Sequence, residues 1–194
     1  VRKAGETLKS LHGEAFSLAI LKQRWHRYYE NRVKHVKSGW LAALPKVDKG
    51  QAARLKQDLC STTSAERVVD FSSVGAQSGY IAQRLHNRSL YLASMFLLPE
   101  VAHLRLHLFA HGTIRILNVG GGPGFEAVGL QLLADFFGEH VNFIHEIIDI
   151  EGNWAGAVDI LNAVLKQESA TANTSMTFSI RDLRRLDLPL CRGS

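Results

Sequence analysis

A run of glycines stands between a short apolar stretch and a longer amphipathic one. The run is Gly120-Gly-Gly-Pro-Gly124, and it directly follows the β-like segment Thr113–Val119. A strand that ends in glycines and passes into a helix brings backbone N–H groups close to a ligand, because no side chain stands in the way. Gly124 also permits close packing between the helix and the strand. The pattern predicts a ligand-binding loop at 120–124.

Acidic residues occupy the equivalent place after the next two predicted strands. Asp149 closes one of them, Glu151 follows it closely, and Asp182 comes after the other. A glycine-rich loop alone is a weak signal. A strand before it, a helix after it and carboxylates at the following strand ends make the prediction of a binding site more specific.

The segments around the loop alternate between strand and helix patterns. From residue 113 onward the predicted order is β-α-β-α-β, and the later members are Phe125–Phe137, Asn142–Ile150, Trp154–Gln167 and Ser175–Ile180. Strands that alternate with helices imply parallel pairing through right-handed crossovers. We therefore expect an α/β fold with a Rossmann-like parallel sheet, of which 113–194 supplies one half-domain. An α-helical region, 1–112, precedes it.

The spacing within the loop separates two classes of cofactor. Enzymes that bind dinucleotides need G-x-G-x-x-G/A, in which the sixth position is small. Here that position is Phe125, and the glycines instead form G-x-G-x-G. This resembles motif I of the class I S-adenosylmethionine-dependent methyltransferases, over about residues 113–190. A nucleotide-dependent oxidoreductase is a third reading, which Phe125 disfavours.

The resemblance implies S-adenosylmethionine as the cofactor and gives each residue a role. The cofactor-binding residues that it implies are Asn118, Gly120, Gly121, Gly122, Gly124, Asp149, Glu151 and Asp182. The glycines would lie beside the methionine part of the cofactor. Asp149 matches the acid that binds the ribose hydroxyls, since a carboxylate accepts two hydrogen bonds from a vicinal diol. Glu151 is the alternative for that role, and Asp182 matches the residue that contacts the adenine amino group.

Two departures from the family pattern bear on function. The family commonly has Asp or Glu where this chain has Asn118, whose amide can bond the amino acid moiety but brings no counter-charge. The family's fourth strand should begin near Cys191, and Cys191–Ser194 is not a strand. The first strand, 114–119, would then be an unpaired apolar edge. We therefore expect a second chain, or a missing C-terminal half, to complete the sheet.

The helical front part is strongly basic. Residues 1–112 carry 17 Lys and Arg against 8 Asp and Glu, and the rest of the chain is mildly acidic. Lys22–Lys56 holds much of this charge, interleaved with aromatic residues, which is typical of a surface for RNA or another acidic partner. The alternative is an ordinary amphipathic helix, in which Trp25, Tyr29 and Trp40 share one buried face.

The rest of the front part reads as further helices. Thr63–Glu66 resembles a capping box for a helix that runs to about Ser72, and breakers at Gly75, Ser78 and Gly79 precede helices over 80–98 and 100–110. His103, His107 and His111 share one side of the last helix, a spacing that can bind a metal. Without further ligands nearby, such histidines more often lie beside the apolar face of a helix than bind a metal. That helix should bury Val101, Leu104 and Leu108.

The sequence predicts no catalytic side chain. It contains no legible Ser-His-Asp or Cys-His arrangement, its two cysteines are far apart, and no apolar run is long enough for a membrane span. No secretory signal is legible, so an intracellular location is expected, with cytoplasm, nucleus and organelle left open. The first hypothesis is a methyltransferase whose substrate is RNA or nucleic-acid-associated. The second is a non-catalytic methyltransferase-like scaffold, or binding subunit, of a larger ribonucleoprotein complex.

Overall fold

The computed structural model describes residues 18–44, 50, 53, 71–169 and 171–181. Their order is helical first and alternating afterwards. The elements are α2 (Leu18–Ala43), α4 (Val74–Met95), η1 (Pro99–Val101), α5 (Ala102–Ala110), β1 (Thr113–Val119), α6 (Phe125–Phe137), β2 (Asn142–Asp149), η2 (Gly152–Trp154), α7 (Ala155–Glu168) and β3 (Asn173–Ile180).

The three strands form one parallel sheet in the order β1-β2-β3. In its register Thr113 pairs with Asn142, and Asn142 pairs with Asn173 on its other side. The three strands therefore end together, and the segment after each strand emerges at the same edge of the sheet. This confirms the α/β class with an incomplete Rossmann-like sheet. β3 begins two residues before the predicted start at Ser175.

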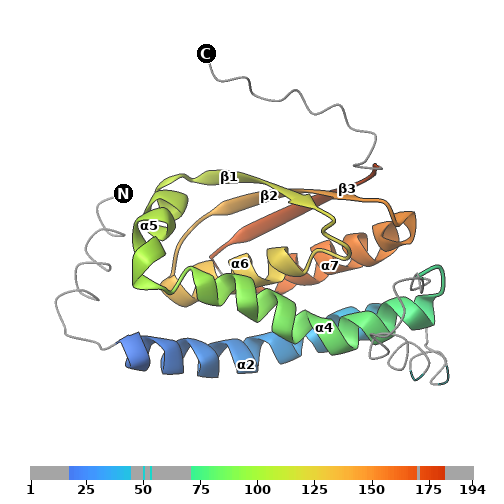
Figure 1. Ribbon diagram of the computed structural model, residues 1–194, viewed down its shortest axis with the longest axis horizontal. Helices are drawn as coiled ribbons and strands as arrows, with labels where there is room; N and C mark the ends of the chain where they lie inside the picture. Colours follow the sequence, from blue (N-terminus) through green and yellow to red (C-terminus); the bar gives the residue numbers. More distant parts are fainter. Residues whose placement is uncertain (1–17, 45–49, 51–52, 54–70, 170, 182–194) are drawn as a thin grey trace, which may run out of the picture.

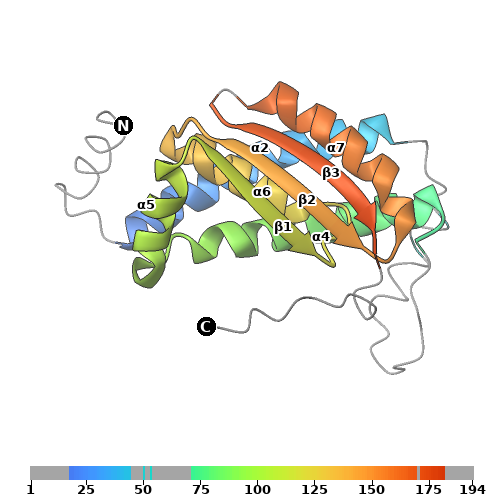
Figure 2. The ribbon, with the colours of Figure 1, turned by 90° about the horizontal axis from the view of Figure 1, so that it is seen from above.

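Only one face of the sheet is covered by described helices (Figure 1). α6 and α7 pack beneath it, and α2 and α4 form a further layer beneath them, as Figure 2 also shows. On the opposite face Leu117 and Val119 are 58% and 57% exposed. In the order of the described strands, β1 lies at one edge of the sheet. An edge position is what the sequence predicts for this strand.

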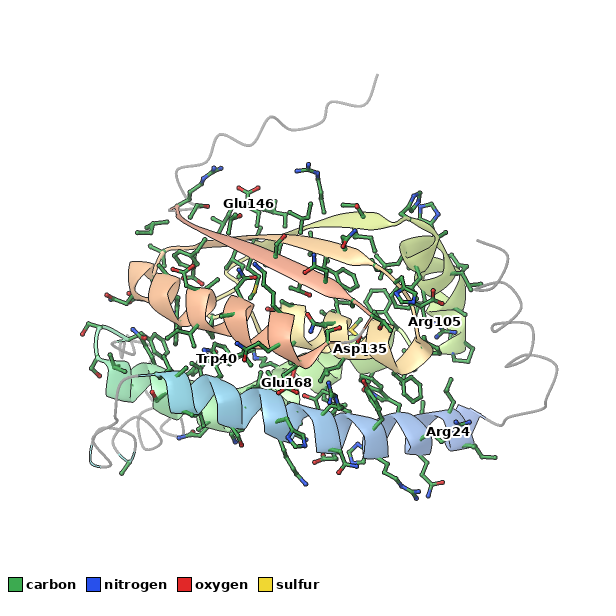
Figure 3. All side chains as sticks on the ribbon, turned by 180° about the vertical axis from the view of Figure 1, so that it is seen from behind. Arg24, Trp40, Arg105, Asp135, Glu146 and Glu168 are labelled. Carbon is green, nitrogen blue, oxygen red and sulfur yellow. The ribbon has the colours of Figure 1, made fainter. Side chains whose placement is uncertain are left out.

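The front helices share one hydrophobic core with α6 and α7. Trp25, Tyr29 and Trp40 are all at most 2% exposed, so the helical spacing correctly predicts their buried face. The indole N–H of Trp40 donates to the carbonyl of Ala157 at 3.0 Å, and Figure 3 shows this side chain between α2 and α7. The buried aromatic face of α2 thus supports the two helices that carry the sheet.

Two predictions about the front helices are wrong. Gly75, Ser78 and Gly79 do not interrupt a helix but lie inside α4, which starts at Val74 because the Ser73 hydroxyl caps its first turn. In α5, Leu104 is 49% exposed, whereas Arg105 is buried. Arg105 lies 5.0 Å over the Phe137 ring and donates to the Phe96 carbonyl, so its long side chain fills the place expected for a leucine.

One prediction about the front part lies outside the described residues, and the absence of a membrane span is examined within them. The predicted capping box at Thr63–Glu66 falls on residues beyond the described ones, so its helix is not tested. No helix in the described part of the chain is both long and apolar enough to cross a membrane.

The crossing of α4 and α6 supplies a stability prediction. A Cβ at Gly129 would collide with the Ser89 carbonyl oxygen, whereas a Cβ at Gly156 in α7 would meet nothing within 4 Å. Gly129→Ala should lower the free energy of unfolding by about 2 kcal/mol or more, since the helices must separate. Gly156→Ala should be neutral or stabilising by up to about 1 kcal/mol, because alanine favours the helix. Urea unfolding measures both, and equal losses would contradict the predicted close crossing.

Candidate functional site

The glycine loop adopts a backbone conformation that favours glycine at three positions. Gly120, Gly122 and Gly124 have φ angles of 63°, 50° and 86°. This left-handed region is open to glycine but costly for most other residues. The Gly120 N–H donates to the Ile148 carbonyl at 2.8 Å, and the Gly124 N–H donates to the Gly121 carbonyl at 3.0 Å. The loop is therefore a fixed turn at the end of β1.

The loop is crowded on its inner side and open on its outer side. A Cβ at Gly121 would lie 2.9 Å from the Asn118 Cβ, and one at Gly124 would lie 2.9 Å from the Ile147 Cδ1. A Cβ at Gly120 would meet nothing within 4 Å. The loop thus packs tightly on β2, while its outer surface leaves room for a ligand to approach the backbone.

Asp149 connects this loop to the segment after β2. Its Oδ2 accepts the Gly122 N–H at 2.8 Å, and its Oδ1 accepts the Glu151 N–H at 2.9 Å. An ionised carboxylate has about four acceptor sites, so about two stay available after these bonds. The half-buried Asp149 can therefore hold the loop and still accept hydrogen bonds from the hydroxyls of a ligand.

Glu151 has a different task. Its Oε1 accepts the Asn153 backbone N–H at 3.1 Å and the Asn153 side-chain amide. These bonds cap η2, which begins at the next residue. The structure therefore brings Glu151 next to Asp149 but gives its carboxylate a local structural partner. Asp182 lies outside the described residues.

Asn118 lies beneath the loop rather than on its open side. It is 8% exposed, and its amide nitrogen lies 3.0 Å from Nδ1 of His145, a fully buried residue of β2. Burial lowers the pKa of His145 to about 4, so the ring is neutral near pH 7. With a neutral ring the Asn118 amide donates to Nδ1. His145 Nε2 has no hydrogen-bond partner among the described residues.

Sequence reasoning missed His145, although a signal for it exists. Along the inward face of β2, Phe143 and Ile147 are apolar and His145 is the polar residue between them. A polar side chain on a buried strand face needs a partner, because burying it unpaired is costly. Asn118 on the neighbouring strand is that partner.

The front helices also reach the site, through Gln77 at the start of α4. The Gln77 amide nitrogen donates to the Phe71 carbonyl at 2.9 Å and to the Asn153 carbonyl at 3.0 Å. Gln77 is 6% exposed, so these bonds are shielded from water. The site is therefore built from both parts of the chain.

An aromatic cluster continues this contact. The centroid of the Phe71 ring lies 4.7 Å from that of Trp154 and 5.0 Å from that of Tyr80. The Tyr80 ring stacks on the Phe125 ring, with 5.6 Å between their centroids. These rings come from α4 and its approach, from η2 and from the first residue of α6. They make one apolar support beside the loop and the segment after β2.

A buried carboxyl group stands next to the loop at Glu126, in the first turn of α6. Burial raises its pKa, and the Arg88 guanidinium partly opposes that shift. Its Oε2 is buried with no hydrogen-bond partner in the described part of the chain. The sequence analysis did not single it out, because an acid in a first helical turn is ordinary.

The remaining sequence candidates lie away from this edge. His103 and His107 on α5, and His111 directly after it, are exposed, and no group of three potential ligands suited to a metal occurs among the described residues. On α2, Lys22, Arg24, Arg27 and Lys34 are exposed, while the indoles of Trp25 and Trp40 are buried. The described part of Lys22–Lys56 therefore offers charge to a partner, without Trp25 and Trp40 as stacking surfaces.

The buried His145 predicts how stability depends on pH. The unfolded chain binds a proton at its ordinary pKa of 6.5 and the folded chain only near pH 4, so the free energy of unfolding should fall as the pH drops through this window. The loss of unfolding free energy should approach roughly 3 kcal/mol near pH 4. His145→Gln should flatten this slope in urea unfolding measured from pH 7 to pH 4, and the exposed His103→Gln should not. An unchanged slope in the His145 variant would contradict the prediction.

Comparisons with known proteins add no relative to this picture. No protein-family model matches the chain, and no curated protein and no solved structure matches it either.

Proposed function

We propose that this chain binds S-adenosylmethionine at the carboxyl edge of its sheet and serves as the cofactor-binding half of a methyltransferase. The observation that carries the proposal is the bond from the Gly122 N–H to Asp149. It places an open glycine backbone and a carboxylate with free acceptor sites at adjacent strand ends. That is the combination needed by a ligand with both an amino acid part and a vicinal diol.

The residues present fit this cofactor in part. A Cβ at Gly120 would meet nothing within 4 Å, so the outer side of the loop leaves its backbone open to a ligand. Asp149 would accept the ribose hydroxyls, a role for which Glu151 is less suited because it caps η2. Asn118 would act from beneath, by fixing the end of β1 through His145. When bound, the cofactor supplies a sulfonium-activated methyl group.

The front helices would complete the site. Gln77 fixes the segment after Asp149, and the cluster of Phe71, Tyr80 and Trp154 shields it from water. Methyl transfer needs an acceptor held in line with the methyl group and a site from which water is excluded. These side chains position the segment and exclude water, and no proton transfer is assigned to a residue of this chain.

RNA or a nucleic-acid-associated molecule is the substrate class that the charge favours. The exposed cations of α2 can neutralise phosphates, which gives binding that weakens as the salt concentration rises. Since Trp25 and Trp40 are buried, this binding would depend on charge and not on their stacking.

The second candidate function is a non-catalytic scaffold. The observations that favour it are the neutral Asn118, in the place where the family that the chain resembles has an acid, and a sheet face that no described helix covers, on which Leu117 and Val119 are exposed. We propose that further strands, from a second chain or from a longer form of this chain, pair with β1. If the protein is a scaffold, the function of the fold is this pairing of strands and not catalysis.

Cofactor binding tests the first function directly. Calorimetric titration with S-adenosylmethionine should show micromolar binding by the unaltered chain. Asp149→Ala should weaken that binding at least about tenfold, which is about 1.4 kcal/mol, because the ribose acceptor and the anchor of Gly122 are both lost. Asp159→Ala is the matched control, since Asp159 is an exposed carboxylate on α7. Binding that survives Asp149→Ala would contradict the assigned site, and a folded chain that binds nothing would favour the scaffold.

The contact between α4 and the site supplies a second binding test. Gln77→Leu removes both hydrogen bonds of the amide at nearly constant volume and should lower the affinity for S-adenosylmethionine several-fold, by about 1 kcal/mol. Gln83→Leu, further along α4, should leave it unchanged. Equal affinities in both variants would show that the front helices do not support the site.

A further inference from the structure

A groove lies between the first half of α2 and the last half of α4. Figure 1 shows these two helix segments at the end of the molecule away from the carboxyl end of β1. Its volume is about 730 Å³. The residues that line it are Lys22, Gln23, Trp25, His26, Leu90, Tyr91, Ser94, Met95, Leu97 and Leu98. None of them belongs to the proposed cofactor site.

The floor and the α4 side of this groove are apolar. Trp25 and Leu97 are buried, whereas Tyr91, Met95 and Leu98 are 72%, 44% and 37% exposed. Large exposed apolar side chains that gather in one groove are uncommon on a surface without a partner. Methionine and tyrosine suit such a role, because methionine adapts its shape and tyrosine offers a large contact area at small entropic cost.

The α2 side of the groove is basic. Lys22 and His26 line it, and no lining residue is acidic. The carboxylate of Glu30, one turn beyond His26, accepts a hydrogen bond from His86 at 2.6 Å and faces His26 at 3.7 Å. An apolar floor beside this basic side fits a ligand with an apolar face and an acidic flank.

We propose that this groove binds an acidic amphipathic helix of a partner protein. A groove between two packed helices can hold a third helix, whose apolar anchors are one turn apart. Charge disfavours two other occupants, which are the chain's own segment 1–17 and a second copy of the chain. Residues 1–17 carry three Lys and Arg against two Glu, and a second copy brings a net charge of +5. The Leu face of such a helix complements the apolar floor of the groove, and its Glu face complements the basic α2 side.

The probe is a fluorescently labelled helical peptide of about 18 residues, with Leu at helical spacing and Glu elsewhere. Fluorescence anisotropy with the full chain should give a dissociation constant in the micromolar range. Two peptides serve as comparisons, one with Lys in place of Glu and one with the same composition in scrambled order. Each should bind at least about tenfold more weakly, because one lacks the charge and the other lacks the apolar face.

Two pairs of variants locate the binding. Met95→Gln should weaken it at least about fivefold, whereas Leu106→Gln, a comparably exposed apolar residue on α5, should not. Lys22→Glu should weaken it at least about fivefold, whereas Lys34→Glu makes the same change of charge on α2 outside the groove and should weaken it less than about twofold. Circular dichroism confirms that each variant is folded.

Three outcomes would overturn the proposal. They are no binding to the full chain, equal binding of the scrambled peptide, and equal losses in both lysine variants. The last would describe a general polyanion surface in place of a helix groove.

Discussion

The Asp149 carboxylate is the interaction on which the arrangement at the carboxyl edge of the sheet depends. It accepts one backbone N–H from the glycine loop and one from the segment after β2. Because β1 and β2 are neighbours in a parallel sheet, these two segments emerge side by side, and their N–H groups need acceptors. A carboxylate between them satisfies two such groups. Without it, the loop would lose the contact that fixes its outward-facing backbone.

The second constraint is that the described helices cover only one face of the sheet. Three strands with α6 and α7 make a thin core, and the buried aromatic face of α2 enlarges it. Packing the front helices there brings the start of α4 to the edge where the strands end, so that Gln77 can bond the segment after β2. At the other end of α4, the same two helices line the apolar groove. One arrangement of helices therefore accounts for both proposed surfaces.

The sequence predicts the alternating half of the fold well, because local signals are strong there. Glycines at both ends of α6 and the apolar pattern of β2 mark boundaries that packing does not change. It predicts the front half less well. Gly75 and Gly79 suggest a break, but tertiary packing overrides their low helix propensity within α4. The pairing of Asn118 with His145 and the reach of Gln77 depend on neighbours distant in sequence, which periodicity does not reveal.

The central claim is that the loop and Asp149 together form the cofactor site. Its most direct test is an NMR titration of the nitrogen-15-labelled chain with S-adenosylmethionine, following the amide signals of Gly122 and Glu151. Both amides donate to Asp149, so a ligand at this carboxylate must shift them together, in step with a single dissociation constant. Joint shifts that saturate, and that are absent in Asp149→Ala, are the predicted result. Saturable shifts elsewhere, with both amides unmoved, would contradict the account.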